Sequence, residues 1–186
     1  DAGLTGDRSV RMFNELDEAL EWTEERALER AQLEKPQRPA LNLSDFTVFA
    51  GRAEETLTEL ESCMEQRRFE AGETIFKTGD SGDELYFVRR GAARIILPIG
   101  ALNHHVATFR RGDFFGEMSF LDRQPRSADA VAERETDLFV LSRTRFDALV
   151  DHHHHKLGAN VLSGIAIALA HRLRHANAEL RTLHEV

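Results

Sequence analysis

Residues 114–130, FFGEMSFLDRQPRSADA, combine a glycine, a carboxylate and an arginine within a short stretch of chain. Gly116 and Glu117 open a run with the pattern of a short helix, and Arg126 follows Pro125. The first backbone N–H groups of a helix lack internal partners and therefore attract an anion. A guanidinium carries a permanent charge and can bind two phosphate oxygens at once. These residue types therefore predict an anion-binding site.

The neighbouring residues narrow the ligand to a nucleotide. Ser127 offers a hydroxyl and a backbone N–H, and Ala128 lets a ligand approach the backbone closely. Glu117 would repel an anion, but a carboxylate is suited to accept hydrogen bonds from ribose hydroxyls. One arginine without a lysine-bearing phosphate loop or evident magnesium ligands fits a single phosphate better than a triphosphate. For Arg126 taken alone, the alternative is an exposed cation or one half of an ion pair.

The chain on either side of this stretch must form the elements that position it. Between residues 68 and 142, short apolar runs alternate with glycine-rich corners, as in GETIFKTGDSGDELYFVRRGAARI. This rhythm is typical of an antiparallel barrel or roll. The pattern predicts an α+β, mainly β, protein: an antiparallel β-roll or jelly-roll-like barrel at about 68–142. An N-terminal helix, a short helix within 114–130 and two C-terminal helices accompany the roll.

Helical patterns flank the predicted roll on both sides. One helix is expected at 53–64, a second over RTRFDALVDH with Ser142 or Thr144 as its cap, and a long one at 156–184. Apolar residues of the long helix are spaced alternately by four and three, in a heptad-like seam: Leu162, Ala166, Leu169, Leu173, Ala176, Leu180 and Leu183. Two roles remain open for this seam: packing on the roll as a lid, or pairing with a second copy of the chain.

FGEMSFLDRQPRSADA resembles the phosphate-binding cassette of the cyclic nucleotide-binding domain family, and the glycine-rich strands before it are similar to that family's roll. The resemblance covers residues 46–183 and implies a β-roll flanked by helices that binds cAMP or cGMP. It implies that Glu117 accepts a hydrogen bond from the ribose 2′-hydroxyl and that Arg126 holds the cyclic phosphate. The cassette residues that it places in the site are Gly116, Glu117, Met118, Ser119, Arg126, Ser127 and Ala128.

Two further residues bear on this resemblance. Asp129 stands where many members of the family carry threonine or serine, and an acid facing the phosphate would oppose binding. Strand alternation allows its side chain to point away from the site, which removes the conflict. Arg172 matches by position an arginine that some channel-type members use near the base, and it joins the predicted site. Its alternative is a surface cation near acidic neighbours.

The composition argues against several other functions. The chain of 186 residues carries 24 Lys and Arg against 32 Asp and Glu, and this net charge of −8 argues against nucleic-acid binding. A single cysteine, Cys63, excludes a disulfide framework within one chain and favours a cytoplasmic setting. No apolar run approaches the ~20 residues of a membrane span.

We expect no catalysis, because no nucleophile or catalytic motif stands out. We expect no metal, because the consecutive histidines of DHHHHK at 151–156 point in different directions and form a polar hinge.

The first 35 residues differ in pattern from the rest. SVRMFNELDEALEWTEERAL predicts a strand and a helix, and it resembles the closing strand and helix of a STAS domain, as in sulfate-permease-type anion transporters. This resemblance implies a regulatory tail on the cytoplasmic side of such a transporter, with the STAS-like part at 1–35, a linker at 36–45 and the nucleotide-binding domain at 46–186.

Three alternatives concern the parent protein and the assembly. Some bacterial glutaminases carry a similar tail, so a glutaminase is the second candidate for the parent. A degenerate fold that has lost nucleotide binding would act as a dimerisation or interaction module. A homodimer would form through the C-terminal helix or through the N-terminal helix around Trp22.

Overall fold

The structure is a computed structural model that describes residue 23 and residues 39–100, 102–151 and 155–184. The chain divides into two compact units, Asp1–Arg38 and Pro39–Val186. The strand and helix predicted within residues 1–35 lie outside the described residues, apart from Thr23, which is helical. All the strands that the structure describes belong to the second unit.

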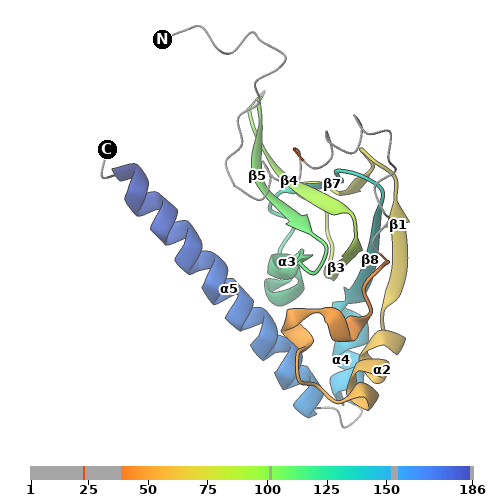
Figure 1. The fold of residues 1–186 in the computed structure, drawn as a ribbon. Helices are drawn as coiled ribbons and strands as arrows, with labels where there is room; N and C mark the ends of the chain where they lie inside the picture. Colours follow the sequence, from red (N-terminus) through yellow and green to blue (C-terminus); the bar gives the residue numbers. More distant parts are fainter. Residues whose placement is uncertain (1–22, 24–38, 101, 152–154, 185–186) are drawn as a thin grey trace, which may run out of the picture. The chain divides into compact units, whose positions relative to one another are not determined.

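The strands of the second unit form two four-stranded antiparallel sheets (Figure 1). The strand order is β1-β8-β3-β6 in the first sheet and β2-β7-β4-β5 in the second. The bounds are β1 Glu65–Phe69, β2 Thr74–Phe76, β3 Glu84–Arg90, β4 Ala92–Ile99, β5 Leu102–Arg110, β6 Phe114–Phe115, β7 Asp129–Ala132 and β8 Thr136–Ser142. The predicted antiparallel β-roll is confirmed, and it begins at Glu65, slightly before the expected start.

The central strands of the first sheet are buried on both faces. On β3, Leu85 and Phe87 belong to a core cluster shared with the helices, whereas Tyr86 and Val88 pack with residues of the second sheet. Strand β8 divides its apolar residues between the same two clusters. Successive side chains of a strand point to opposite faces, so a strand buried on both faces requires a continuous apolar run. The runs LYFV and LFVL supply it.

The α-helices of the second unit lie at the places that the sequence predicts. The α-helices are α2 Glu54–Ser62, α3 Glu117–Asp122, α4 Arg143–Asp151 and α5 His155–His184, and two 3₁₀ turns, η1 Leu43–Asp45 and η2 Thr47–Phe49, precede them. Ser142 caps α4, because its Oγ accepts a hydrogen bond from the Arg145 N–H at 3.3 Å. The short helix α3 is the helical part of the cassette.

The segment before α2 differs from the predicted linker at 36–45. Leu41 and Leu43 are buried in the core cluster. The Leu41 N–H donates to the Arg89 carbonyl at 3.0 Å, and Arg89 Nε donates to the Leu41 carbonyl at 2.9 Å. The sequence ALNL contains two leucines, but the prolines and polar residues around them hide the pattern of a buried segment. The second compact unit therefore begins at Pro39.

Helix α5 uses a different apolar stripe from the predicted seam to pack on the core. The buried core-facing residues are Leu157, Val161 and Ile165. Within the seam, Leu162 and Leu169 are partly buried against the same cluster. Ala166 is exposed, and Leu173 is 64% exposed. The seam is therefore only partly covered by its own domain.

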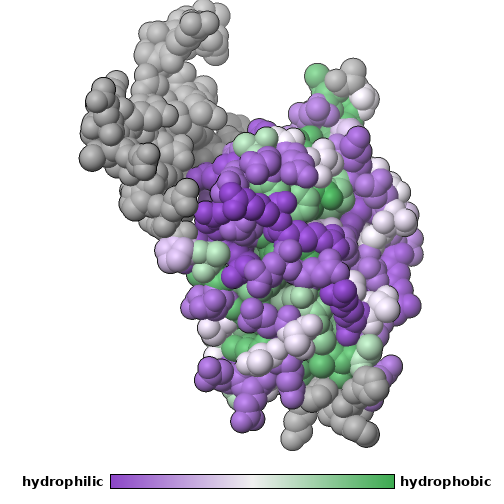
Figure 2. All heavy atoms as spheres, turned by 90° about the vertical axis from the view of Figure 1, so that its right-hand side faces the viewer, coloured by the Kyte–Doolittle hydropathy of each residue, from purple (hydrophilic) through white to green (hydrophobic). Residues whose placement is uncertain are grey.

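The face of the second unit on the side of β1 is mainly hydrophilic, with smaller hydrophobic patches between the polar residues (Figure 2). Strand β1, EQRRF, contributes to this character because its Gln66 and Arg68 side chains are exposed. Among the described residues, no helix has both the length and the apolar composition that crossing a membrane requires.

Candidate functional site

Arg126 lies in the loop between α3 and β7, and its backbone is hydrogen-bonded to the loop between β2 and β3. Its N–H donates to the Asp80 carbonyl at 2.9 Å, and its own carbonyl accepts from the Gly79 N–H at 2.8 Å. The residue is only 3% exposed. A buried guanidinium stays charged and therefore requires partners, so the alternative of an exposed surface cation does not describe Arg126.

Backbone oxygens and an aromatic ring hold the Arg126 guanidinium. Nη1 donates to the carbonyls of Glu84 at 2.9 Å and Gly116 at 3.2 Å. The guanidinium carbon lies 4.3 Å from the centre of the Phe76 ring. Within the described part of the chain, Nε and Nη2 of Arg126 make no hydrogen bond. Two charged donors are therefore available to an anion.

Gly116 allows the approach between the cassette and this arginine. It is the N-cap of α3, with a φ of 80°. A Cβ at this position would lie 3.0 Å from Arg126 Nη1 and 2.9 Å from the Glu84 carbonyl oxygen. A residue with a side chain would be strained in this conformation and would displace the guanidinium.

A cavity of about 330 Å³ lies next to Arg126, on the inner side of the cassette. The predicted site residues that line it are Gly116, Glu117, Met118, Ser119, Arg126, Ser127 and Ala128. The structure thus brings together, around one cavity, all the cassette residues named from the sequence. The other lining residues are apolar: Phe76, Ile95, Leu97, Val106, Ala107, Phe109 and Phe115.

Arg172 of α5 contacts the cassette without lining this cavity. Its Nη2 donates to the Phe114 carbonyl at 2.6 Å, and its Nη1 lies 3.5 Å from Glu117 Oε1. Its guanidinium also lies 4.5 Å from the ring centres of Phe109 and Phe114. Glu117 itself is largely buried, with 13% of its side chain exposed. Arg172 therefore connects the long helix to the carboxylate of the cassette, and it is not the surface cation of the alternative interpretation.

The Asp129 carboxylate points away from the cavity. Its Oδ1 accepts hydrogen bonds from the Thr78 N–H at 2.7 Å and from the Thr78 hydroxyl at 2.8 Å. These hydrogen bonds, the backbone one first, lower the pKa of Asp129. The acid at this position is thus used to fix the loop after β2, and it does not oppose an anion next to Arg126.

Comparisons with known proteins agree with this geometry. A sequence profile described as cyclic nucleotide-binding domain matches residues 66–153. The crystal structure of a cyclic nucleotide-binding domain from Methylobacillus flagellatus KT superposes with a TM-score of 0.67 at 30% identity, covering 74% of this chain and 77% of that one. The chain belongs to the cyclic nucleotide-binding domain family.

Two curated relatives of this cyclic nucleotide-binding domain are longer proteins. The cyclic AMP receptor protein of Thermus thermophilus is 37% identical over 73% of this chain and 61% of its own length. Glutaminase 1 of Bradyrhizobium diazoefficiens is 32% identical over 95% of this chain and 28% of its own length. The chain thus corresponds to a part of each relative, less than two thirds of its length in both cases.

The sequence predicts an apolar roll that receives the base, but it did not identify the individual residues of the apolar lining. Ile95 and Leu97 on β4, and Ala107 and Phe109 on β5, are spaced by two, so each pair lies on one face of its strand. This spacing is visible in the sequence. It does not tell which face of a two-sheet roll lines a cavity and which face packs in the core.

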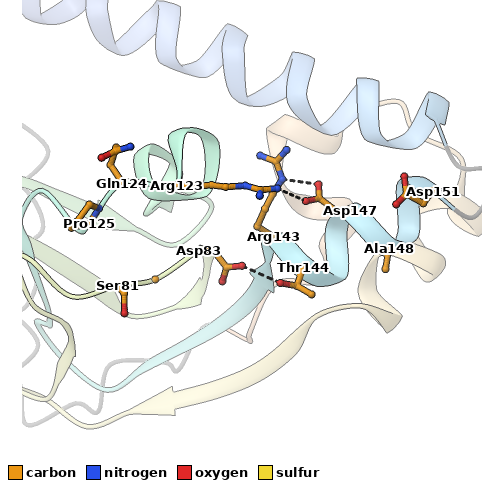
Figure 3. Close-up of a pocket in the computed structure, with 11 residues that line it drawn as sticks. Ser81, Asp83, Arg123, Gln124, Pro125, Arg143, Thr144, Asp147, Ala148 and Asp151 are labelled. Carbon is orange, nitrogen blue, oxygen red and sulfur yellow. Dashed lines mark hydrogen bonds and ion pairs between the residues drawn. The ribbon is translucent and has the colours of Figure 1, made fainter.

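A second hollow of about 680 Å³ lies among the loop before β3, the end of α3 and helix α4 (Figure 3). Asp147 binds two arginines there, with Arg123 Nη2 at 2.9 Å and Arg143 Nε at 2.7 Å. On the opposite side, the Thr144 hydroxyl donates to the Asp83 carboxylate at 3.3 Å. These pairs connect the cassette helix and the β2–β3 loop to α4. Within this hollow, the two arginines and Asp147 are paired with one another.

Proposed function

We propose that this domain binds a cyclic mononucleotide, cAMP or cGMP, in the 330 Å³ cavity and regulates a longer protein without catalysing a reaction itself. The main support is Arg126, a buried permanent cation with two unbonded donors beside a mostly apolar cavity. A ligand with one negative charge and an apolar base is complementary to this arrangement. The volume is at the lower end of the range of roughly 300–1,000 Å³ found for small-molecule sites.

In this proposal, different cassette residues bind different parts of the ligand. Arg126 binds the cyclic phosphate, together with the hydroxyl of Ser127 and the backbone at Ala128. Among the described residues, the Ser127 hydroxyl has only the Met118 sulfur as a partner, at 3.5 Å, and a thioether is a weak acceptor. Glu117 accepts a hydrogen bond from the ribose 2′-hydroxyl. The base packs against the apolar residues that complete the cavity.

Calorimetry with cAMP and with cGMP tests this proposal. Replacing Arg126 by Ala removes a buried charge-assisted contact, which costs on the order of 2–5 kcal/mol, or a loss of affinity of about 30-fold or more. Arg94→Ala is the matched control, because Arg94 is an exposed arginine on β4. We expect binding to wild type and to Arg94→Ala and strongly weakened binding to Arg126→Ala. Absence of binding to wild type would overturn the proposal and favour an interaction module.

We further propose that α5 carries the response to the ligand. Arg172 pairs with Glu117, the residue assigned to the ribose. The N-terminal part of the same helix, α5, packs against the hydrophobic core. A ligand shifts a helix only if it binds one arrangement more tightly than another. A ribose hydroxyl on Glu117 provides such a difference, because it fixes the carboxylate to which Arg172 is attached.

For the parent protein, the comparisons favour a glutaminase. The similarity to Glutaminase 1 covers 95% of this chain, so it includes most of residues 1–38. We propose a regulatory domain of a glutaminase; the STAS-containing anion transporter remains a prediction. An assay of glutamine hydrolysis by the full-length protein, with and without cAMP, tests this assignment. Membrane spans without a glutaminase domain in the full-length sequence would favour the transporter.

A further inference from the structure

A second carboxylate lies close to Arg126, and other residues hold it back. Glu84 Oε2 is 4.0 Å from Arg126 Nη2, beyond hydrogen-bond distance. The same Oε2 accepts a hydrogen bond from the Tyr86 hydroxyl at 2.5 Å. Its other oxygen, Oε1, pairs with Arg67 Nη2 at 2.6 Å. Both oxygens of Glu84 are therefore engaged with residues other than Arg126.

The backbone of Glu84 has a separate role. Its carbonyl accepts the 2.9 Å hydrogen bond from Arg126 Nη1 that orients the guanidinium. A substitution of the side chain leaves this carbonyl in place. The effect of the Glu84 carboxylate on Arg126 can therefore be tested separately from the positioning of Arg126.

The charge balance around Arg126 explains why such a carboxylate is present. The Arg126 side chain is 2% exposed, and a buried cation without any opposite charge is costly. A carboxylate in full contact would satisfy the arginine but would occupy the donors that an anion needs. At 4.0 Å, Glu84 compensates the charge while Nε and Nη2 remain unbonded.

Tyr86 and Arg67 keep the carboxylate at this distance. Burial first, and then the hydrogen bond to Glu84, raise the pKa of Tyr86, so the phenol stays protonated and remains a donor. Arg67 also pairs with Glu65 at 2.8 Å, and Glu65 pairs with Arg145 of α4 at 2.8 Å. Arg67 is thus held by two carboxylates, Glu65 on its own strand and Glu84 on β3.

We propose that the Glu84 carboxylate competes with the bound anion for Arg126, while Arg67 and Tyr86 hold it back. This restrained competition sets the affinity of the site for its anion. This inference rests on the proposed function, with the cyclic phosphate as the anion. Glu84 lowers the affinity by its negative charge, and Arg67 and Tyr86 limit this effect. It is a positioning and affinity-determining residue, since it acts on the ligand through Arg126.

The proposal predicts that substitutions in this network change the nucleotide affinity in opposite directions. Glu84→Gln removes the competing charge and keeps the size of the side chain, so nucleotide binding becomes tighter. At an effective dielectric constant of about 20, removal of one negative charge near the bound anion corresponds to a gain on the order of tenfold. Arg67→Met and Tyr86→Phe each release one carboxylate oxygen toward Arg126, so binding becomes weaker. A purely structural role of the network would weaken binding in all three variants.

Calorimetry with cAMP and cGMP at one ionic strength, together with thermal unfolding of each variant, tests this prediction. Glu54→Gln is the control for the loss of one negative charge, because Glu54 is exposed at the start of α2. We expect tighter binding for Glu84→Gln, weaker binding for Arg67→Met and Tyr86→Phe, and no change for Glu54→Gln. Unchanged or weaker binding by Glu84→Gln, with wild type binding normally, overturns this inference and leaves the proposed function intact. If neither wild type nor Glu84→Gln binds either nucleotide, both proposals are overturned.

Discussion

At the scale of single residues, Gly116 is the position where a side chain is least compatible with the site. Its φ of 80° is strained for other residues, and an added Cβ would meet Arg126 Nη1 at 3.0 Å. We expect Gly116→Ala to lower the free energy of unfolding by about 1–2 kcal/mol through backbone strain alone, and to weaken cAMP binding through the displaced guanidinium. Gly100→Ala is the matched control, because Gly100 has a φ of 62° and open space around an added Cβ. Chemical denaturation and calorimetry measure both effects; equal losses in the two variants would contradict a role for close packing at Gly116.

Single residues of the site were predictable where they are adjacent in the sequence. Gly116, Glu117 and Arg126 belong to one cassette, whose residue types and order already indicate an anion and a hydroxyl partner. Phe76 and Glu84, which also surround the guanidinium, come from β2 and β3 and reach it only through folding. No local pattern relates these residues to the arginine, so the sequence did not reveal them.

At the scale of elements, α5 reaches the cassette through Arg172, which pairs with Glu117 and also contacts the ring of Phe109. We expect cAMP to slow amide hydrogen exchange over residues 162–174 of α5, because the ribose hydroxyl fixes Glu117 and thereby its partner Arg172. Arg172→Met keeps much of the apolar stem but removes the pair, so the slowing should be lost. Arg174→Met is the control, since Arg174 is exposed on the same helix. Identical exchange in wild type with and without cAMP would contradict a response of α5 to the ligand.

The elements themselves were largely predictable, and the exceptions have physical reasons. Glycine corners and apolar runs indicated the roll, and the periodicity indicated α4 and α5. The two 3₁₀ turns η1 and η2 were missed because three residues are too short for a helical period. The face of α5 that meets the core was also missed, because the stripe through Leu157 and Ile165 and the heptad seam are both apolar. Only contact with the rest of the domain distinguishes the two stripes.

At the scale of the whole molecule, the exposed part of the α5 seam predicts that the domain pairs with a second copy. Leu173 is 64% exposed, and Ile167 beside the seam is 57% exposed. Heptad spacing allows two such helices to pack their apolar residues against each other. We expect static light scattering to give twice the mass of one chain at micromolar concentration. Leu173→Glu should give the mass of a single chain, because a buried carboxylate at the helix interface would be unpaired.

A matched control and a truncation separate this dimer from other associations. Leu102→Glu places the same charge at another exposed leucine, on β5, where 66% of the residue is exposed, and it should leave the mass unchanged. Removal of residues 1–35 distinguishes the two helices proposed for pairing: a dimer that persists without them but is lost in Leu173→Glu is formed through α5. A truncated chain that becomes monomeric, while Leu173→Glu remains dimeric, would assign the interface to the N-terminal helix. Because Arg172 lies next to Leu173, pairing through α5 would place the contact between two copies one residue from the arginine that reaches the cassette.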